Sequence, residues 1–574
     1  MPTGGPVASY PVTQGTGAQN QPYVQIQPQP PGADWSPEQI VEGFLTASAS
    51  YGSYPQVANE YLTPTEQNTW NPYWQAVVYK TGPGVTVVPG SSTAKNPTAS
   101  VAVTGTIQAN LSGNGSYFLP SGGSSGVRPP DFQLVKVGTQ WRISFAPQEL
   151  LLTSNSFAND YQLRNLYFFD PQSKFLVPDP VYVPVQNPGN PMDRLVNELI
   201  VPPAGDWLSG GATQTAFPKG TKVSGVTLDG VTAVVNLTGT AIGKADDDRM
   251  RQVSAQLLWT LSVNASNGSN GQGVQSVEVT VNGKSWPEGQ GNPVQSKPTE
   301  WSPAPGSSKE FYYITSDGYL ARETAGEKPA SIAKIGTGYS QIAVSPDGRY
   351  LAALRDGTLL TGLIDGPLTK RGGGFVAMSW DSNDDLLASA SQGQQIVMFR
   401  GPTGTRQPFA PPVTVNVVGA LGPPFTALQV APDGVRVALV SGTNQLTFGG
   451  ISGRTTGHPT ITLSQVQESP PTQGQSVSAA VNFTALSWYG PDNVIALAGP
   501  PTSPTVTEYP VTGGTPAPLQ AVPHMNTIAA SYGEPLIAGL SKGRMWIDAG
   551  LTGSWTQITD GNTPANGNSP TYPG

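Results

Sequence analysis

The side chains that most often carry out chemistry are scarce in this 574-residue sequence, which contains no cysteine and only two histidines, His458 and His524. Both histidines stand beside proline in stretches typical of loops. A Ser-His-Asp triad needs a histidine that an acid orients towards a serine. In many hydrolases this serine lies in a Gly-x-Ser-x-Gly turn between a strand and a helix, and we expect no such turn here. A zinc site needs three or four Cys, His or acidic ligands, which the sequence hardly offers. A phosphate-binding Gly-x-x-x-x-Gly-Lys loop does not occur.

Two groups of aspartates remain as candidates for acid–base chemistry or metal binding. The first could supply the paired carboxylates of a glycosidase on the loops of a repeat domain. Its members, which no sequence context distinguishes, are Asp365, Asp381, Asp384 and Asp385. The second, Asp246 to Asp248, could bind calcium but fits better as the acidic start of a helix around Met250, where the helix dipole favours negative charge. We therefore predict that the protein is not an enzyme and has no catalytic, cofactor-binding or metal-binding residue.

The C-terminal part of the chain contains a repeat of an apolar strand, a Pro-Asp-Gly type turn and a second apolar strand. Equivalent positions in successive repeats are Ser345, Ser379, Ala431, Ser487 and Ser531, so that the steps are 34, 52, 56 and 44 residues. This spacing is typical of the blades of a β-propeller, and an earlier strand pair at 311–320 adds one unit. We predict an all-β propeller of about six blades over residues 309–559, closed with the help of 542–555. The turns are interpreted as structural, because chemistry would need the motif only once.

Residues 150–285 are predicted to form an α+β domain with helices on one face of a sheet. Strands are expected at 166–170 and 176–185, followed by a helix at 190–200 with Asn190 as its N-cap. A hairpin around Asp229-Gly230, a helix at 250–261 and a strand at 274–281 complete the predicted domain.

Residues 35–149 are predicted to form a smaller α+β domain of the NTF2-like type, with three short helices before a curved antiparallel sheet. Its strands are expected at 85–88, 101–109, 132–137 and 141–145, and a helix over 150–164 would connect it to the next domain. Four aromatic residues could line a pocket or, more simply, fill the core: Trp70, Trp74, Tyr79 and Trp141.

The remaining segments are polar. Residues 1–34 are rich in Gly, Gln, Pro and Ser and are predicted to be a disordered tether, as in a lipoprotein whose signal peptide and lipid-bearing cysteine are missing from this chain. Residues 286–308 are predicted to be a linker, and 560–574 a disordered tail. No apolar run approaches the roughly 18 residues of a membrane-spanning helix. The net charge of -8 argues against a nucleic-acid partner.

Several motifs make the central domain resemble the GerMN module of bacterial envelope and sporulation proteins. They are Tyr167-Phe-Phe-Asp170, Val177-Pro-Asp-Pro-Val-Tyr-Val183, Phe217-Pro-Lys-Gly-Thr221, Val234-Val-Asn-Leu237, Leu258-Trp-Thr-Leu261 and Val279-Thr-Val-Asn-Gly283. With the leader and small α+β domain before it and the propeller after it, nearly the entire chain is similar to the LpqB-type lipoproteins of actinobacteria.

The resemblance implies a non-catalytic accessory lipoprotein on the extracytoplasmic face of the cell membrane, held there by an N-terminal lipid anchor. It further implies that the protein modulates the MtrAB two-component system by contacting the extracytoplasmic domain of the sensor kinase MtrB. The family contributes no catalytic residues to this chain.

Two functions of different class remain open from the sequence. A protein-interaction scaffold would bury about 800 Å² per partner on a propeller face or on the GerMN sheet. A protein that binds cell-wall glycan or peptide would use a pocket in the first domain or the propeller channel, and a propeller hydrolase is the less favoured variant. A clustered acidic and aromatic pocket would favour the second class, and a flat apolar patch with a polar rim would favour the first.

Overall fold

The computed structural model describes residues 28–574 apart from 50–54, 73–74, 81–83, 89–96, 119–128, 185–189, 204–206, 265–273, 287–300, 302, 304–307, 325–326, 402–408, 469–480, 515, 549–553, 561–562 and 565. The chain forms two compact bodies. The first comprises Met1–Gln108, Gly122–Gln162 and Pro184–Pro188, and the second comprises Ala109–Ser121, Leu163–Val183 and Gly189–Gly574.

The first body begins with three helices, α1 (Pro37–Ala49), α2 (Pro55–Glu60) and α3 (Pro64–Thr69). An antiparallel sheet follows in the order β2-β3-β6-β7, with bounds Gly84–Val88, Thr98–Thr104, Phe132–Val137 and Gln140–Phe145. β1 (Ala76–Tyr79) pairs in parallel with β8 (Leu150–Thr153) in a second sheet. The apolar residues of α1 recur at helical spacing, so that Ile40, Val41 and Phe44 are all buried.

Two predicted elements of this body are wrong. The single strand expected over 101–109 is two strands, because β3 ends at Thr104 and β4 (Ile107–Leu111) begins after Gly105. The helix expected over 150–164 is limited to α4 (Ser154–Asp160). Thr153 caps α4 by accepting the Ser156 N–H at 2.9 Å, and the apolar residues before it pair with β1 instead of joining the helix.

The last residues of the predicted tether are ordered on the first body. The Tyr61 hydroxyl donates a hydrogen bond to the Gln29 carbonyl oxygen at 2.6 Å. The Trp35 indole lies against Gly32 so closely that a Cβ there would be 2.3 Å from Nε1. The disorder predicted for 1–34 is therefore wrong from residue 28 onward, and residues 1–27 lie outside the described part of the chain.

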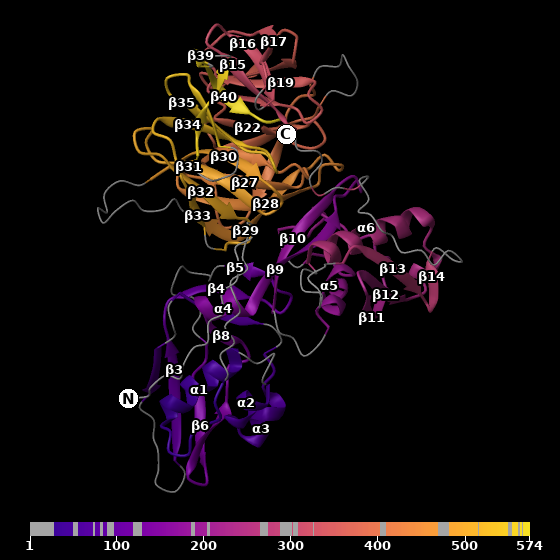
Figure 1. The fold of residues 1–574 in the computed structure, drawn as a ribbon, viewed down its shortest axis with the longest axis vertical. Coiled ribbons are helices and arrows are strands. Elements are labelled where there is room, and N and C mark those ends of the chain that lie inside the picture. Colours follow the sequence, from indigo (N-terminus) through magenta and orange to yellow (C-terminus); the bar gives the residue numbers. More distant parts are fainter. Residues whose placement is uncertain are drawn as a thin grey trace. The chain divides into compact units, whose positions relative to one another are not determined.

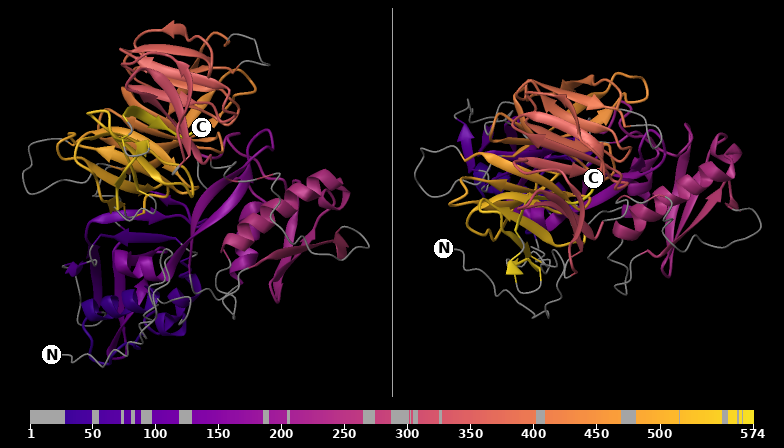
Figure 2. Two further views of the ribbon diagram at one scale, coloured as in Figure 1. Left: turned by 45° about the horizontal axis from the view of Figure 1, so that its top comes forward. Right: turned by 90° about the horizontal axis from the view of Figure 1, so that it is seen from above.

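The second body starts with the central module, defined as the described residues of 163–183 and 190–303. β9 (Tyr161–Phe169) and β10 (Leu176–Pro184) form a two-stranded ribbon. A four-stranded sheet has the order β11-β12-β13-β14, with bounds Lys222–Asp229, Thr232–Thr238, Ser276–Val281 and Lys284–Trp286. The helices α5 (Pro191–Leu199) and α6 (Asp247–Asn264) lie on one face of that sheet, as Figure 2 shows. The predicted N-cap is confirmed, since Asn190 Oδ1 accepts the Met192 N–H at 3.1 Å.

Polar side chains of α6 connect the helix to the rest of the module. Thr260 accepts the Tyr167 N–H at 3.1 Å, and Gln256 donates to the Tyr167 carbonyl oxygen at 2.7 Å. Both α6 residues are fully buried, so these bonds satisfy groups that would otherwise be costly to remove from water. Trp301, at the end of the predicted linker, joins the same core, stacking edge-on against Phe169 at 5.7 Å.

The described residues from 308 to 574 form a propeller of six blades, the third and fourth of which join in one eight-stranded sheet, and the predicted fold is confirmed (Figure 1). Blade one holds β15 (Glu310–Thr315), β16 (Tyr319–Thr324), β17 (Ala330–Lys334) and β40 (Gly567–Thr571); blade two holds β18 (Gln341–Val344), β19 (Tyr350–Arg355), β20 (Thr358–Leu363) and β21 (Thr369–Gly372). Blade three holds β22 (Ala377–Trp380), β23 (Leu386–Ala390), β24 (Gln395–Phe399) and β25 (Val413–Val418); blade four holds β26 (Phe425–Val430), β27 (Arg436–Ser441), β28 (Gln445–Ser452) and β29 (Thr460–Glu468). Blade five holds β30 (Phe483–Tyr489), β31 (Asn493–Ala498), β32 (Thr505–Pro510) and β33 (Ala517–Leu519); blade six holds β34 (Met525–Ala529), β35 (Leu536–Leu540), β36 (Met545–Asp548) and β37 (Thr556–Gln557).

The ring closes through a strand that composition did not predict. β40 pairs antiparallel with β15, with Tyr312 opposite Thr571, and Figure 1 shows the yellow β40 among the strands of blade one. The predicted disordered tail at 560–574 is therefore wrong, and closure does not come from 542–555, whose strand β36 belongs to blade six. The segment is polar, so its apolar pattern is weak, and its order comes from completing an otherwise open blade.

Adjacent blades are joined by a repeated Ser-Trp pair on their first strands. The Trp380 indole donates to the Ala343 carbonyl oxygen of the preceding blade at 3.0 Å, and Ser379 accepts the Val430 N–H of the following blade at 2.9 Å. Trp488 makes the equivalent bond to Gln429 at 2.9 Å. The inner strands are thus connected to one another by side chains as well as by apolar packing.

Candidate functional site

The candidate site is the junction at which the central module packs on three turns of the propeller. These turns connect the first and second strands of blades three, four and five, and they contain Asp381–Asp385, Pro432–Gly434 and Pro491–Asp492. They are therefore members of the recurring Pro-Asp-Gly type family. The junction is the place where the predicted acidic candidates of blade three meet another part of the second body.

Apolar packing holds the module to blades four and five. Trp207 and Leu208 of the module are buried in one cluster with Phe448 and Trp488 of the propeller. The backbones approach most closely at Gly450 in β28, where a Cβ would lie 2.0 Å from the Trp207 carbonyl oxygen. Only glycine fits at this position without a shift of one of the two backbones.

Gly450→Ala should therefore displace the module from blade four. The added methyl group meets a backbone atom that no side-chain rotation can move, and overpacking of this kind costs about 1–3 kcal/mol. We expect faster amide hydrogen exchange over 207–212 and a lower midpoint of thermal unfolding. Gly373→Ala is the matched control, since a Cβ at Gly373 would meet nothing within 4 Å. Equal exchange in the two variants would contradict the close approach.

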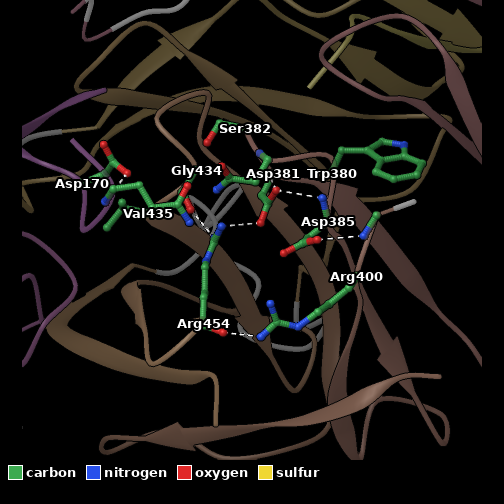
Figure 3. A network of polar contacts seen from close by, with 12 residues as sticks. Asp170, Trp380, Asp381, Ser382, Asp385, Arg400, Gly434, Val435 and Arg454 are labelled. Carbon is green, nitrogen blue, oxygen red and sulfur yellow. Dashed lines mark hydrogen bonds and ion pairs between the residues drawn. The ribbon is translucent and has the colours of Figure 1, made fainter. Parts of the chain in front are cut away.

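The blade-three turn carries a buried ion pair, drawn in Figure 3. Arg454, just after β28, donates through Nη1 to Asp381 Oδ2 and through Nη2 to the Gly434 carbonyl oxygen. Asp381 Oδ1 accepts two backbone N–H groups, from Asn383 at 2.7 Å and from Asp385 at 2.9 Å. Because the Asp381 side chain has no exposed surface and uses both oxygens within the protein, it serves the turn and not a substrate.

Blade four repeats this arrangement with Asp433 and Arg436. Asp433 Oδ1 accepts the N–H of Val435 at 2.8 Å and of Arg436 at 2.9 Å, and Oδ2 accepts Arg436 Nε at 2.6 Å. The Arg436 guanidinium also lies 5.2 Å from the centre of the Trp488 ring and donates to the Pro491 carbonyl oxygen at 2.5 Å. This ion pair therefore ties blade four to blade five.

The module contributes Asp170, whose carboxylate is likewise occupied. Its Oδ2 accepts the Gln172 N–H at 2.9 Å, and its Oδ1 accepts those of Lys174 and Phe175 at 2.6 and 2.7 Å. The Lys174 ammonium reaches the propeller and donates to Asn383 Oδ1 at 3.1 Å. The acids on both sides of the junction shape loops and hold them together.

Burial alters the acidity of two blade-three carboxyls. Loss of solvation raises the pKa of Asp381 to about 6, against the opposing effect of Arg454. Burial, followed by the negative charge of Asp347 in blade two, also raises the pKa of Asp384 to about 6. Asp384 Oδ1 is sealed from solvent and has no hydrogen-bond partner within the described ranges.

Asp384→Asn should stabilise the protein at pH 7.5. A carboxyl whose pKa is raised by folding stabilises the folded state below its ordinary pKa near 4, and this contribution is lost as the pH rises through about 6. Asparagine removes the charge and tolerates the φ of 58° at this position. Because 23% of the side-chain surface is still exposed and solvent screens its charge, we expect a gain of about 1 kcal/mol in the free energy of urea unfolding at pH 7.5 that shrinks towards pH 4. Asp365→Asn is the control, because Asp365 lies in an exposed turn and its replacement should leave the free energy of unfolding unchanged at both pH values.

A small cavity lies between the module and the turns. Its volume is about 40 Å³, and its lining residues are Asp170, Pro171, Gln172, Gly211, Asn383, Asp433, Gly434, Val435, Ile451, Ser452, Gly453, Arg454 and Thr455. This space admits a few water molecules, whereas pockets for organic ligands start at roughly 300 Å³. No group of three His, Cys, Asp or Glu side chains able to hold a metal occurs among the described residues.

The aromatic candidates of the first domain do not form one site. Trp70 is buried against Phe44 at 5.0 Å and donates to the Pro147 carbonyl oxygen at 2.8 Å. Tyr79 is buried in β1, and Trp141 is half-buried beside the Lys136 ammonium at 5.4 Å. The residues that are described thus act in packing, and Trp74 lies outside the described part of the chain.

The remaining histidines and aspartates that the sequence suggested as site residues do not belong to the junction. His458 and His524 are both exposed, on different blades, and Asp365 is in an exposed turn of blade two. Asp246 accepts the Arg249 N–H at 2.8 Å, and Asp247 and Asp248 occupy the first turn of α6. The interpretation of this acidic run as a helix start is confirmed.

The residues that the sequence did not reveal are the arginines of the junction. Arg436 follows the Asp433-Gly434 turn by two positions, and Arg349 stands directly after the equivalent Asp347-Gly348 turn, where it pairs with Asp347. An arginine close after the turn is thus a local signal that could have been found. Arg454 carries no such signal, because its partner Asp381 is 73 positions earlier.

Three family models match this chain in succession. Residues 30–158 match the lipoprotein LpqB N-terminal domain, residues 165–286 match the sporulation and spore germination (Germane) domain, and residues 318–573 match the lipoprotein LpqB β-propeller domain. The matches support the predicted GerMN module and the C-terminal propeller. The helices of the described residues include none long and apolar enough to cross a membrane.

Relatives named lipoprotein LpqB align with most of the chain. The protein of Thermobifida fusca is 27% identical over 100% of this chain and 96% of its own length, and that of Streptomyces coelicolor is 26% identical over 96% and 92%. The Mycolicibacterium smegmatis protein is 26% identical over 76% of this chain and 75% of its own. With the three matched domains in this order, the chain belongs to the LpqB lipoprotein family.

Proposed function

We propose that this protein is a lipid-anchored, non-catalytic scaffold on the extracytoplasmic face of the cell membrane, where it modulates the MtrAB two-component system. Its partner is the extracytoplasmic domain of the sensor kinase MtrB. The relatives' name, lipoprotein, supports the anchor, and the polar leader fits a tether between lipid and folded domains.

One observation carries the proposal that the protein works by shape. Three junction acids that could do chemistry are bound within the protein: Asp381 by Arg454, Asp433 by Arg436, and Asp170 by its own loop. A junction built this way fixes the central module on the propeller and exposes a rigid composite surface. Rigid surfaces suit protein recognition, because binding then loses little conformational entropy.

The test is binding of the full chain to two immobilised targets, the purified MtrB extracytoplasmic domain and purified peptidoglycan. The scaffold function predicts saturable binding to the kinase domain and none to peptidoglycan. Binding to peptidoglycan alone would replace the proposal with the cell-wall-binding alternative. Gly450→Ala should weaken kinase binding more than its control Gly373→Ala does, because only the first disturbs the composite surface.

A further inference from the structure

Asp492, in the blade-five turn, is the third acid beneath the central module. Its Oδ2 accepts a hydrogen bond from Asn165 Nδ2 of β9 at 2.7 Å. The two residues are 327 positions apart, so this bond connects the module directly to the propeller. The turn itself is anchored, because the Asp492 carbonyl oxygen accepts the Val511 N–H at 2.8 Å.

Asp492 differs from the other two turn acids in what faces its carboxylate. Asp381 and Asp433 each have an arginine and two backbone N–H donors. The described partner of the Asp492 side chain is a neutral amide, and Oδ1 is sealed from solvent without a hydrogen-bond partner in the described ranges. A buried anionic oxygen without a donor is costly, and the neutral acid is much less so.

The surrounding charged and titratable groups do not remove this cost. Arg436 is a cation that acts on Asp492, but its guanidinium is already bound to Asp433 and to the Pro491 carbonyl oxygen. On the module side lies the Tyr167 hydroxyl, whose pKa is raised mainly by burial and further by Asp492, so that it remains neutral. Tyr532 of blade six in turn acts on the Tyr167 hydroxyl. Burial raises the pKa of Asp492 against the opposing effects of Arg436 and Asn165.

We propose that Asp492 is a proton-controlled clasp, which holds the central module on the propeller more tightly when its carboxyl group is protonated. The proton comes from solvent and goes to the carboxyl group, and no covalent bond is involved. If docking favours the protonated acid, protonation must favour docking by the same factor. The extra affinity is present at low pH and is lost as the pH rises through the pKa of the docked form.

This inference goes beyond the proposed function, because it assigns a pH response to the surface that the scaffold presents. An acidic environment would favour the docked module. Alkaline conditions would loosen it at blade five while the Asp381 and Asp433 ion pairs still hold the neighbouring turns. The contact of Asp492 with Asn165 is therefore the adjustable part of an otherwise fixed junction.

The absence of native cysteines allows a direct measurement in the full chain. Val201 of the module and Val418 of the propeller are 45% and 48% exposed, so cysteines placed there can carry a donor and an acceptor dye. Energy transfer in urea below global unfolding reports the ratio of docked to undocked protein. We expect this ratio to fall about tenfold from pH 5 to pH 8, because burial disfavours the charged carboxyl group in the docked form.

Asp492→Asn mimics the neutral acid and is the central variant. It should dock more tightly than the unchanged protein at pH 8, and its docking should depend less on pH. Asp381 and Asp384 titrate in the same range in both proteins, so the difference between the two isolates Asp492. Weaker docking of the variant at pH 8, or an unaltered pH dependence, would overturn the proposal.

A second variant, Asn165→Asp, tests the same proposal if Asp492→Asn does not fold. Asn165→Asp places another carboxyl group opposite Asp492, and two adjacent carboxylates share a proton readily. We expect a steeper loss of docking with rising pH than in the unchanged protein. An unchanged slope would also overturn the proposal. Neither result depends on MtrB, so failure of the clasp and failure of the kinase interaction are separate outcomes.

Discussion

Truncation before Gly567 will prevent the propeller from folding as one cooperative unit. The deletion removes β40, leaves β15 with an open edge on the inner side of blade one, and removes Tyr572, which is buried against Phe311 at 6.2 Å. An unclosed ring loses contacts on both sides of the gap, since β40 packs against β18 and β34. The loss is comparable to the roughly 5–15 kcal/mol stability of a typical domain.

The measurement is soluble yield together with the thermal unfolding of the purified truncated protein. A matched control ends at Tyr572 and removes only Pro573 and Gly574, so β40 and its aromatic anchor remain. We expect the control to unfold in a single propeller transition close to that of the unchanged protein. A truncated protein with the same transition would show that β40 does not close the ring.

Arg454→Met will strongly destabilise the junction. It leaves Asp381 buried without a cation and removes a donor from the Gly434 carbonyl oxygen. Removing one partner of a buried ion pair costs about 3–5 kcal/mol, because the remaining charge has no compensation. Arg251→Met is the control, since Arg251 and its partner Asp248 are both highly exposed and such pairs contribute about 0–1 kcal/mol.

The loss in Arg454→Met should depend on pH with a defined sign. With Arg454 present the pKa of Asp381 is already about 6, and without the cation it rises further. The carboxyl is then neutral in acid, so the destabilisation should be largest above pH 7 and should decrease as the pH falls below 6. Asp381→Asn added to Arg454→Met should restore part of the stability at pH 7.5. A loss that is independent of pH would indicate that Asp381 is not the group left uncompensated.

The propeller could be predicted because each blade repeats its turn chemistry locally. Proline and glycine in turns such as Pro346-Asp-Gly348 mark where one strand ends and the next begins, whatever the distant contacts are. β40 was not predicted because its conformation depends on a distant partner. Gly567–Thr571 has little apolar pattern and becomes a strand by pairing with β15. The cap at Thr153 likewise overrode the apolar run that suggested a longer helix.

The acidic residues of the junction could be predicted from the sequence, but their partners could not. Asp381, Asp384 and Asp385 were identified as candidates, and the structure does place them in one turn. The role of this turn depends on partners that are distant in the sequence. Arg454 binds Asp381 and Lys174 binds Asn383, and no local sequence pattern predicts these pairs. A carboxylate's chemistry depends on those neighbours, which explains why the same residues could be read as catalytic or as structural.

The pairing of β15 with β40 has a consequence for biosynthesis. The ribosome makes the first strand of blade one at the start of the propeller and its neighbour at the very end, so the nascent domain carries an unpaired edge throughout its translation. The earlier blades can fold as they emerge, whereas the ring can close only after β40 has emerged. A stalled or prematurely terminated chain would therefore be exposed to aggregation and to proteases along that edge.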